Sequence, residues 1–129
     1  MYLIDTSAWI RHFRRGDEFD LRDICPTDDR VLCLPVYQEI LQGIRDESSY
    51  RRIRTILDAA RFVEDPAGRA VYREATELYR MARRQGLTVR SSVDCLIAAC
   101  AMRHNLTVLH HDRDFPNLAS ISALKEQAV

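Results

Sequence analysis

Four acidic residues of this sequence stand at positions where parallel sheets commonly place functional groups. One follows a short apolar run at the start of the chain, two lie near the starts of helix-like segments, and one follows a later apolar run: Asp5, Glu39, Asp94 and Asp112. Because open α/β sheets build their sites at strand ends and helix starts, one cleft can collect all four carboxylates. Carboxylates gathered in this way repel each other unless a cation neutralises them. The pattern therefore predicts a divalent-metal site, and a metal-dependent hydrolase is the leading hypothesis.

Each acid also has an ordinary structural explanation. Asp5 can cap the helix that follows it, as can Thr6 and Ser7. Asp94 can stabilise the N-terminus of the helix in whose first turn it lies, an effect of about 0.3–1 kcal/mol. Glu39, by contrast, lies among apolar neighbours, where Glu is rare unless it is paired or bound to a metal. These explanations account for single acids and do not require that all four occur together.

The loop around the fourth acid carries further candidates, in the sequence His-His-Asp-Arg-Asp-Phe. Asp114 is a fifth acid, for which we favour capping of the turn at Phe115 over metal binding. His110 and His111 suggest a transition metal, but no other His completes a zinc-type set, and carboxylate-rich sites suit Mg²⁺ or Mn²⁺. We therefore expect Mg²⁺, or else Mn²⁺, as cofactor, with the histidines supporting the site or contacting substrate at most.

Short apolar runs alternate with amphipathic segments, and this alternation predicts the elements that position the acids. Strands are expected at 2–5, 31–34 and 107–110, with weaker candidates at 62–63 and 121–124. Helices are expected over about 6–16, 35–44, 48–60 and 67–85, the last ended by Gly86, and from Ser91 or Ser92 to 105. A loop occupies 17–30, and a helical turn 115–118. The alternation is typical of an α/β fold with a mostly parallel sheet of four to five strands, flanked by helices on both faces.

The composition is that of one globular domain, which we expect to span residues 1–129. Hydrophobic residues make up 47% and charged residues 29% of the chain, and the formal net charge of +0 gives no overall field toward nucleic acid or membrane. The four cysteines lack metal-type or C-x-x-C spacing, so we expect free thiols and a reducing compartment. With neither a signal peptide nor a membrane-length apolar run, the chain is expected to be soluble and cytoplasmic.

Four short motifs together resemble the PIN-domain ribonucleases, in particular the small VapC-type toxins of bacterial and archaeal toxin–antitoxin pairs. The motifs are Ile4–Trp9, Glu39–Gly43, Asp94–Ala99 and Asp112–Phe115. Each motif is short enough to occur by chance. All four occur in the family's order within one small domain, and the resemblance extends from Leu3 to about Leu124.

The resemblance implies a PIN-like fold and a metal-dependent endoribonuclease acting on transfer RNA or ribosomal RNA. Asp5, Glu39, Asp94 and Asp112 match the family's acidic quartet, which implies that they are catalytic and bind Mg²⁺ or Mn²⁺. Ser7 matches a hydroxyl position beside that site. The resemblance also implies a homodimer and a cognate antitoxin whose C-terminal segment covers the active site.

The sequence departs from the family pattern at His110, where Thr or Ser is common before the final acidic loop. Such a hydroxyl orients nearby carboxylates, so the change affects the geometry expected around Asp112. We expect His110 to substitute by hydrogen bonding, and the activity to persist because all four acids are present.

Arginine supplies nearly all of the positive charge, since Lys125 is the only lysine. Arg80, Arg83 and Arg84 share one face of their predicted helix and can bind RNA phosphates through salt-sensitive contacts that do not depend on sequence. A solvated helix face explains the same spacing, and a GC-rich genome explains the excess of arginine.

Two other functions fit part of the pattern. A phosphoryl-transfer hydrolase would use Asp5 as nucleophile, but haloacid-dehalogenase-like enzymes place a second Asp two residues later, where this chain has Ser7. A non-catalytic PIN-like module would keep the fold and serve only in binding. The complete acidic quartet favours the nuclease over both.

Overall fold

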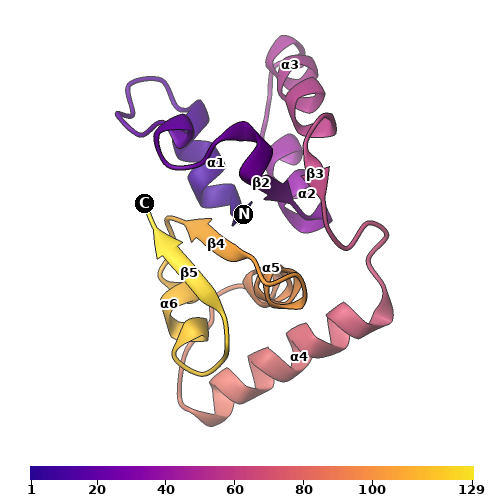
Figure 1. Ribbon diagram of the computed structural model, residues 1–129, viewed down its shortest axis with the longest axis vertical. Helices are drawn as coiled ribbons and strands as arrows, with labels where there is room; N and C mark the ends of the chain where they lie inside the picture. The colour runs from indigo at the N-terminus through magenta and orange to yellow at the C-terminus, as the bar shows by residue number, and fades with distance from the viewer.

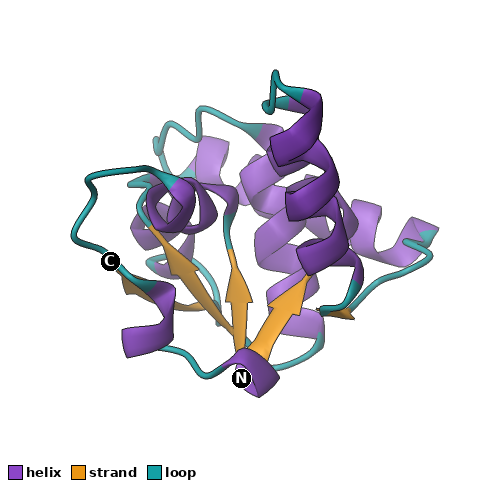
Figure 2. Cartoon of the chain, turned by 90° about the horizontal axis from the view of Figure 1, so that it is seen from above, coloured by secondary structure: helices purple, strands orange, loops and turns teal.

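The structure is a computed structural model that describes all residues from Met1 to Val129. Its centre is a five-stranded sheet in the order β3-β2-β1-β4-β5, in which every neighbouring pair of strands is parallel. The strands are the orange arrows of Figure 2. The strands are β1 (Tyr2–Ile4), β2 (Arg30–Leu32), β3 (Arg61–Phe62), β4 (Thr107–His110) and β5 (Lys125–Ala128). The predicted α/β class is confirmed.

Six helices connect and flank the strands (Figure 1). They are α1 (Thr6–Phe13), α2 (Leu34–Gln42), α3 (Glu47–Asp58), α4 (Arg69–Arg84), α5 (Ser92–Arg103) and α6 (Asp114–Ala119). α4 packs along α5, which in turn contacts β4, α2 and α6 (Figure 1). Because α5 has neighbours on several sides, apolar residues occur all around it rather than in one stripe.

The apolar runs of the sequence form the buried core of the protein. β1 and β4 lie in the middle of the sheet, and their residues Leu3, Ile4 and Leu109 are fully buried, as expected for parallel strands covered on both faces. Trp9 of α1 is also buried. The four cysteines are buried and free. No helix combines the length and the apolar character that a membrane span requires.

Helix ends form largely where the sequence predicts them. Ser91 caps α5 with its side chain, and Gly86 follows α4 with φ of 72°, a conformation that glycine adopts without steric strain. Of the three residues expected as possible caps of the first helix, Asp5 is the one that caps it. Thr6 and Ser7 are the first two residues of α1, and their hydroxyl groups donate hydrogen bonds to Glu39 and Asp5 respectively.

Some predicted boundaries were wrong. The final strand is Lys125–Ala128 rather than 121–124, and β3 begins one residue earlier than the predicted 62–63. β5 is an edge strand with mostly exposed side chains, so it is held by backbone pairing with β4 and needs no apolar run. The predicted loop 17–30 contains two short 3₁₀ helices, η1 (Leu21–Asp23) and η2 (Thr27–Asp29).

Candidate metal centre

The predicted acids gather where β1 and β4 end. Asp5 directly follows β1, and Asp112 lies two residues beyond β4, the adjacent parallel strand. Asp94 stands in the first turn of α5. Glu39 of α2 reaches the same region, where its charge acts on Asp5. The sheet therefore brings the predicted quartet together at its carboxyl edge, as expected for an open α/β fold.

Asp94, Asp112 and Asp114 form a three-acid cluster at the centre of the site. One carboxylate oxygen from each lies within 4.8 Å of the others. Asp94 is 8% exposed and Asp114 only 1%, whereas Asp112 is partly exposed. Buried carboxylates this close together are unfavourable without a neutralising cation. The cluster therefore has the character of a cation site.

Asp114 does not play the capping role predicted for it. The carboxylate makes no capping bond in α6, although Asp114 is the first residue of that helix. The backbone N–H of Asp114, the first of α6, is accepted by Asp112 Oδ1 at 2.9 Å. The Asp114 carboxylate instead points into the cluster, and its Oδ2 accepts the backbone N–H of Arg90 at 3.0 Å. The expected cap of the turn at Phe115 was wrong for this reason.

Asp5 and Glu39 stand beside the cluster and are held by hydroxyl groups. Ser7 donates its N–H, at 2.9 Å, and its hydroxyl to Asp5 Oδ2. The same hydroxyl accepts the N–H of His111 at 2.8 Å. Thr6 Oγ1 donates to Glu39 Oε2 at 2.7 Å. Both acids lie outside the three-acid cluster, so only two members of the predicted quartet belong to it.

Burial and like charge raise the pKa values of two acids. Burial raises the pKa of Asp5, and the charge of Glu39 adds to the effect, while hydrogen bonds from Ser7 oppose it. Burial raises the pKa of Asp94 to about 8, with further contributions from a hydrogen bond to Asp114 and from nearby carboxylates. A carboxyl with this pKa is mainly protonated at neutral pH, so a cation that binds there displaces a proton.

One cationic side chain contacts the acids. Arg90 precedes the cap of α5 and places Nη2 2.9 Å from Asp112 Oδ1 and Nε 3.5 Å from Asp114 Oδ1. No other Lys, Arg or His forms an ion pair with any acid of the site. Arg90 was not predicted from the sequence, because an exposed arginine before a helix has no distinctive pattern.

His110 supports the backbone of the loop that carries Asp112. It is 1% exposed, and its Nδ1 accepts the backbone N–H of Asp112 at 3.1 Å. Nε2 therefore carries the proton that bonds to Glu126 of β5, at 2.6 Å. The contact agrees with the hydrogen-bonding role predicted for His110, although it fixes the backbone of Asp112 rather than its carboxylate. Neither His110 nor His111 belongs to the cluster.

The donor set of the cluster fits a hard divalent cation. All three side chains offer carboxylate oxygen, and the cluster contains no Cys or His. Oxygen donors of this kind suit Mg²⁺ and Mn²⁺ and disfavour zinc. The residues present therefore match the class of cofactor predicted from the sequence.

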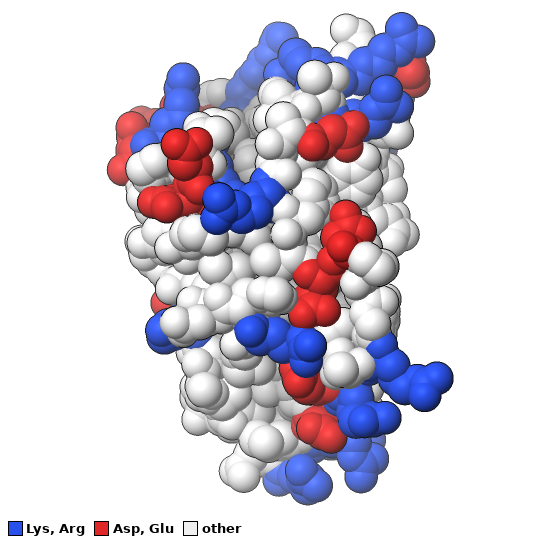
Figure 3. Space-filling model, turned by 45° about the vertical axis from the view of Figure 1, so that its right-hand side comes forward, with Lys and Arg blue, Asp and Glu red and all other residues white.

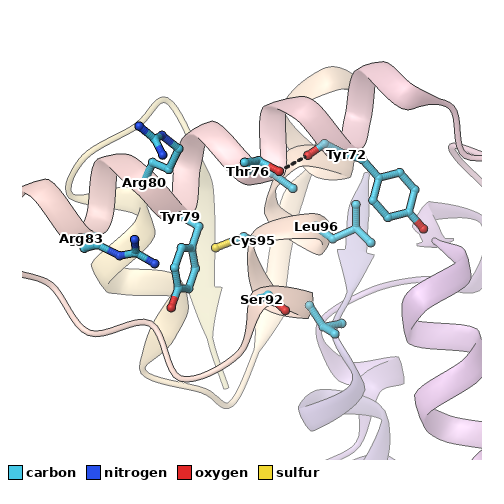
Figure 4. Close-up of a pocket in the computed structure, with 10 residues that line it drawn as sticks. Tyr72, Thr76, Tyr79, Arg80, Arg83, Ser92, Cys95 and Leu96 are labelled. Atoms are coloured by element: carbon cyan, nitrogen blue, oxygen red, sulfur yellow. Dashed lines mark hydrogen bonds between the residues drawn. The ribbon is translucent and has the colours of Figure 1, made fainter.

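The three arginines predicted to bind RNA lie on α4, outside the acid site. Arg80 and Arg83 line a groove of about 530 Å³ between α4 and α5, together with Tyr79 and, from α5, Ser92 (Figure 4). Arg83 lies over the Tyr79 ring at 5.1 Å. Arg84 ends α4, and all three arginines are exposed. Basic side chains, with a few acidic ones among them, gather at the end of the molecule that α4 forms and also at the opposite end, where α3 lies (Figure 3).

Known proteins share both the sequence and the fold of this chain. A model of the PIN domain matches residues 2–121, which include all five acids. VapC ribonuclease Mb1587 of Mycobacterium bovis and ribonuclease VapC11 of Mycobacterium tuberculosis are each 36% identical over 132 residues, which cover 97% of this chain and 96% of the relative. Ribonuclease VapC51 of Mycobacterium tuberculosis is 31% identical over 121 residues, covering 94% and 87%.

Solved structures agree in fold at lower sequence identity. FitAB bound to an IR36 DNA fragment has a TM-score of 0.72 and 16% identity, and the match covers 99% of this chain and 94% of that chain. VapBC2 from Rickettsia felis, bound to a promoter DNA fragment, has a TM-score of 0.72 and 14% identity, covering 99% and 98%. Together with the family match and the mycobacterial relatives, these findings show that the chain belongs to the PIN-domain family, in the group of the VapC proteins.

Proposed function

We propose that this protein is a metal-dependent endoribonuclease that hydrolyses RNA phosphodiester bonds as the toxin of a type II toxin–antitoxin pair. The three-acid cluster, flanked by Asp5 and Glu39, carries the proposal. It occurs in a chain whose relatives at 36% identity are named VapC ribonucleases. The fold alone would not support this activity, because one fold can host many functions.

Mg²⁺, or else Mn²⁺, is the cation that we assign to the site. Asp94, Asp112 and Asp114 would bind this cation. Asp5 would contribute its Oδ1, because its Oδ2 accepts hydrogen bonds from Ser7. A bound divalent ion lowers the pKa of a coordinated water and neutralises charge that develops on phosphate oxygens. Asp5, Glu39, Asp94 and Asp112 are the residues that we propose to be catalytic.

The surrounding groups keep the carboxylates in place. Because Ser7 holds Asp5 and Thr6 holds Glu39 by hydrogen bonds, both acids need little reorganisation during the reaction. Glu39 is partly exposed and lines a second groove next to that between α4 and α5. We assign to Glu39 the role of orienting the attacking water and accepting its proton.

Arg80, Arg83 and Arg84 are the proposed phosphate contacts away from the scissile bond. The support is that none of the three forms an ion pair, and that two of them edge a groove that includes Ser92, two residues before Asp94. Contacts of this type bind any RNA backbone, so the choice of a transfer RNA or ribosomal RNA loop has to come from surface shape.

A cognate antitoxin and a homodimer complete the proposal. Similar structures include VapBC-1 from nontypeable Haemophilus influenzae and VapBC-5 from Mycobacterium tuberculosis, described as a member of the VapBC family of toxin–antitoxin systems. For the second copy, Tyr72 is 54% exposed and Leu96 is partly exposed, and both lie at the end of the α4–α5 groove away from Arg80 and Arg83 (Figure 4). Light scattering of the purified chain would give its mass in solution.

Cleavage assays on purified protein test the enzyme. Structured RNAs are incubated with the protein and Mg²⁺, Mn²⁺ or EDTA, beside an Asp94→Asn variant purified identically. We expect metal-dependent cutting at discrete sites, and a loss of at least about 100-fold in the variant, which lacks a charged ligand of the cluster. Calorimetry with Mn²⁺ measures binding to the same two proteins.

Other outcomes would contradict the proposal in distinct ways. Equal cleavage by both proteins would assign the activity to a contaminating ribonuclease. Absence of both cleavage and metal binding would favour a non-catalytic PIN-like module. A phosphoryl adduct on Asp5, detected by mass spectrometry, would favour the hydrolase that uses Asp5 as nucleophile.

A further inference from the structure

Arg90 has a fixed backbone and a side chain that is free to move. Its N–H donates to Asp114 Oδ2 at 3.0 Å, and the next residue, Ser91, caps α5. The guanidinium contacts the acids from the solvent side, at 2.9 Å from Asp112 Oδ1 and 3.5 Å from Asp114 Oδ1. The Arg90 side chain is 52% exposed and that of Asp114 only 2%. The hydrogen bond between the Arg90 backbone and Asp114 is therefore buried, while the Arg90 guanidinium can turn toward another anionic partner.

A divalent cation and the Arg90 guanidinium require the same carboxylate. Asp112 belongs to the three-acid cluster and is also the nearest ion-pair partner of Arg90. Asp112 Oδ1 already accepts the N–H of Asp114 as well, so this oxygen has little capacity for a third partner. Two positive charges at one carboxylate also repel each other. A cation on Asp112, bound through Oδ1 or through Oδ2, therefore weakens the attraction between this carboxylate and Arg90 and favours release of the guanidinium.

The released guanidinium remains beside the reacting groups because its backbone stays bound to Asp114. Its planar donors match two oxygens of a phosphate, which an ammonium group cannot do equally well. No other cation forms an ion pair with the acids, so Arg90 is the arginine already positioned where the scissile phosphodiester has to lie. A half-exposed ion pair is also weak enough to be exchanged readily.

We propose that Arg90 alternates between two anionic partners: Asp112 and Asp114 in the metal-free site, and the scissile phosphodiester once a divalent cation occupies the cluster. The inference rests on the proposed ribonuclease function and adds a residue that binds the reacting phosphate and stabilises its developing charge. Loss of the guanidinium then has two opposite effects, tighter metal binding and slower cleavage.

Arg90→Gln tests both effects, and Arg113→Gln is its matched control. Arg113 lies between Asp112 and Asp114 in the sequence, but it is exposed and pairs with no acid. Mn²⁺ affinity is measured by calorimetry without RNA, and single-turnover cleavage is measured at saturating Mn²⁺. We expect Arg90→Gln to bind Mn²⁺ about 3–10-fold more tightly and to cleave about 10–100-fold more slowly, with changes under about threefold in the control.

A third variant, Arg90→Lys, separates charge from geometry. It should keep Mn²⁺ affinity near that of the wild type and recover only part of the cleavage rate. Unchanged or weaker Mn²⁺ binding in Arg90→Gln would overturn the inference, as would tighter binding with undiminished cleavage. Melting curves establish that each variant is folded. A wild-type protein that neither binds Mn²⁺ nor cleaves RNA would overturn the proposed function, and the inference with it.

Discussion

Two regions of the molecule concentrate charge of one sign: the acid site, and the arginine face of α4, which Arg80, Arg83 and Arg84 form. The two regions differ in how the structure accommodates that charge. In the acid site each carboxylate is buried or bound to a specific donor, such as Ser7 or Thr6. The arginines of α4 are exposed and form no ion pairs, so water and salt screen their repulsion.

This difference assigns separate tasks to the two regions. Buried like charge raises the free energy of the metal-free fold, and a bound cation removes that penalty. Exposed like charge has little effect on the fold and is available to any polyanion. Substitutions in the acid site should therefore change both stability and reaction, whereas those on the arginine face should change only binding of RNA.

Ser7→Ala should lower metal affinity and activity strongly, although it leaves the acids themselves in place. The variant loses the hydroxyl that donates to Asp5 and accepts the N–H of His111. Loss of such a supporting hydrogen bond typically lowers metal affinity or activity by about 10–100-fold. Calorimetry with Mn²⁺ and kcat/KM for RNA cleavage measure the two quantities. Ser7→Thr keeps the hydroxyl and serves as control, and activity of Ser7→Ala within twofold of it would contradict the prediction.

Asp94→Asn should stabilise the metal-free protein at alkaline pH. The pKa of Asp94 is raised from 3.8 to about 8, so between these values the folded state keeps a proton that the unfolded chain loses. The stability that protonated Asp94 contributes to the folded state is complete below pH 3.8, and it is lost as the pH rises through about 8. Asn does not titrate, and its amide can still donate to Asp114.

The measurement is the melting temperature in EDTA as a function of pH. At pH about 8.5 the variant should melt a few degrees above the wild type, corresponding to about 1 kcal/mol or more, and the difference should shrink toward pH about 4.5. Glu77→Gln, a change of an exposed acid on α4, is the control and should show no such trend. Parallel pH profiles for the wild type and Asp94→Asn would show that burial of Asp94 does not limit the stability of the metal-free fold.

The sequence could place the four acids in the fold, but not assign their roles, because each acid lies close to a local feature. Asp5 ends an apolar run, and Asp94 opens a helix whose cap is a serine. That β1 and β4 are adjacent was not predicted, since no local pattern encodes which strands pair. The sheet order then brings Asp5 and Asp112 to the same edge.

Features that depend on tertiary contacts could not be predicted in this way. An acid at the start of a short helix has the pattern of a cap, so nothing in the sequence distinguishes Asp114 from an ordinary capping residue. Its inward orientation depends on Arg90, which comes from another part of the chain, as well as on Asp112 of the same loop. β5 was misplaced for a related reason, because backbone pairing defines this edge strand and its side chains are mostly polar.

Arg83→Glu/Arg84→Glu should have the smallest effect, confined to RNA binding. The two side chains are exposed and unpaired, so the melting temperature should stay within about 2 °C of the wild type. Affinity for RNA, measured in the Asp94→Asn background to prevent cleavage, should fall several-fold, and its dependence on salt should flatten by about 0.7 in log–log slope for each lost phosphate contact.

Arg45→Glu/Arg52→Glu makes the same change of charge at two exposed arginines, one within α3 and one just before it, and neither forms an ion pair. If RNA binding depends on the arginine face of α4, this control should retain its affinity and salt slope. Equal losses in both double variants would mean that RNA responds only to total charge. No loss in either would confine RNA recognition to the acid site, where Arg90 would then be the principal phosphate contact.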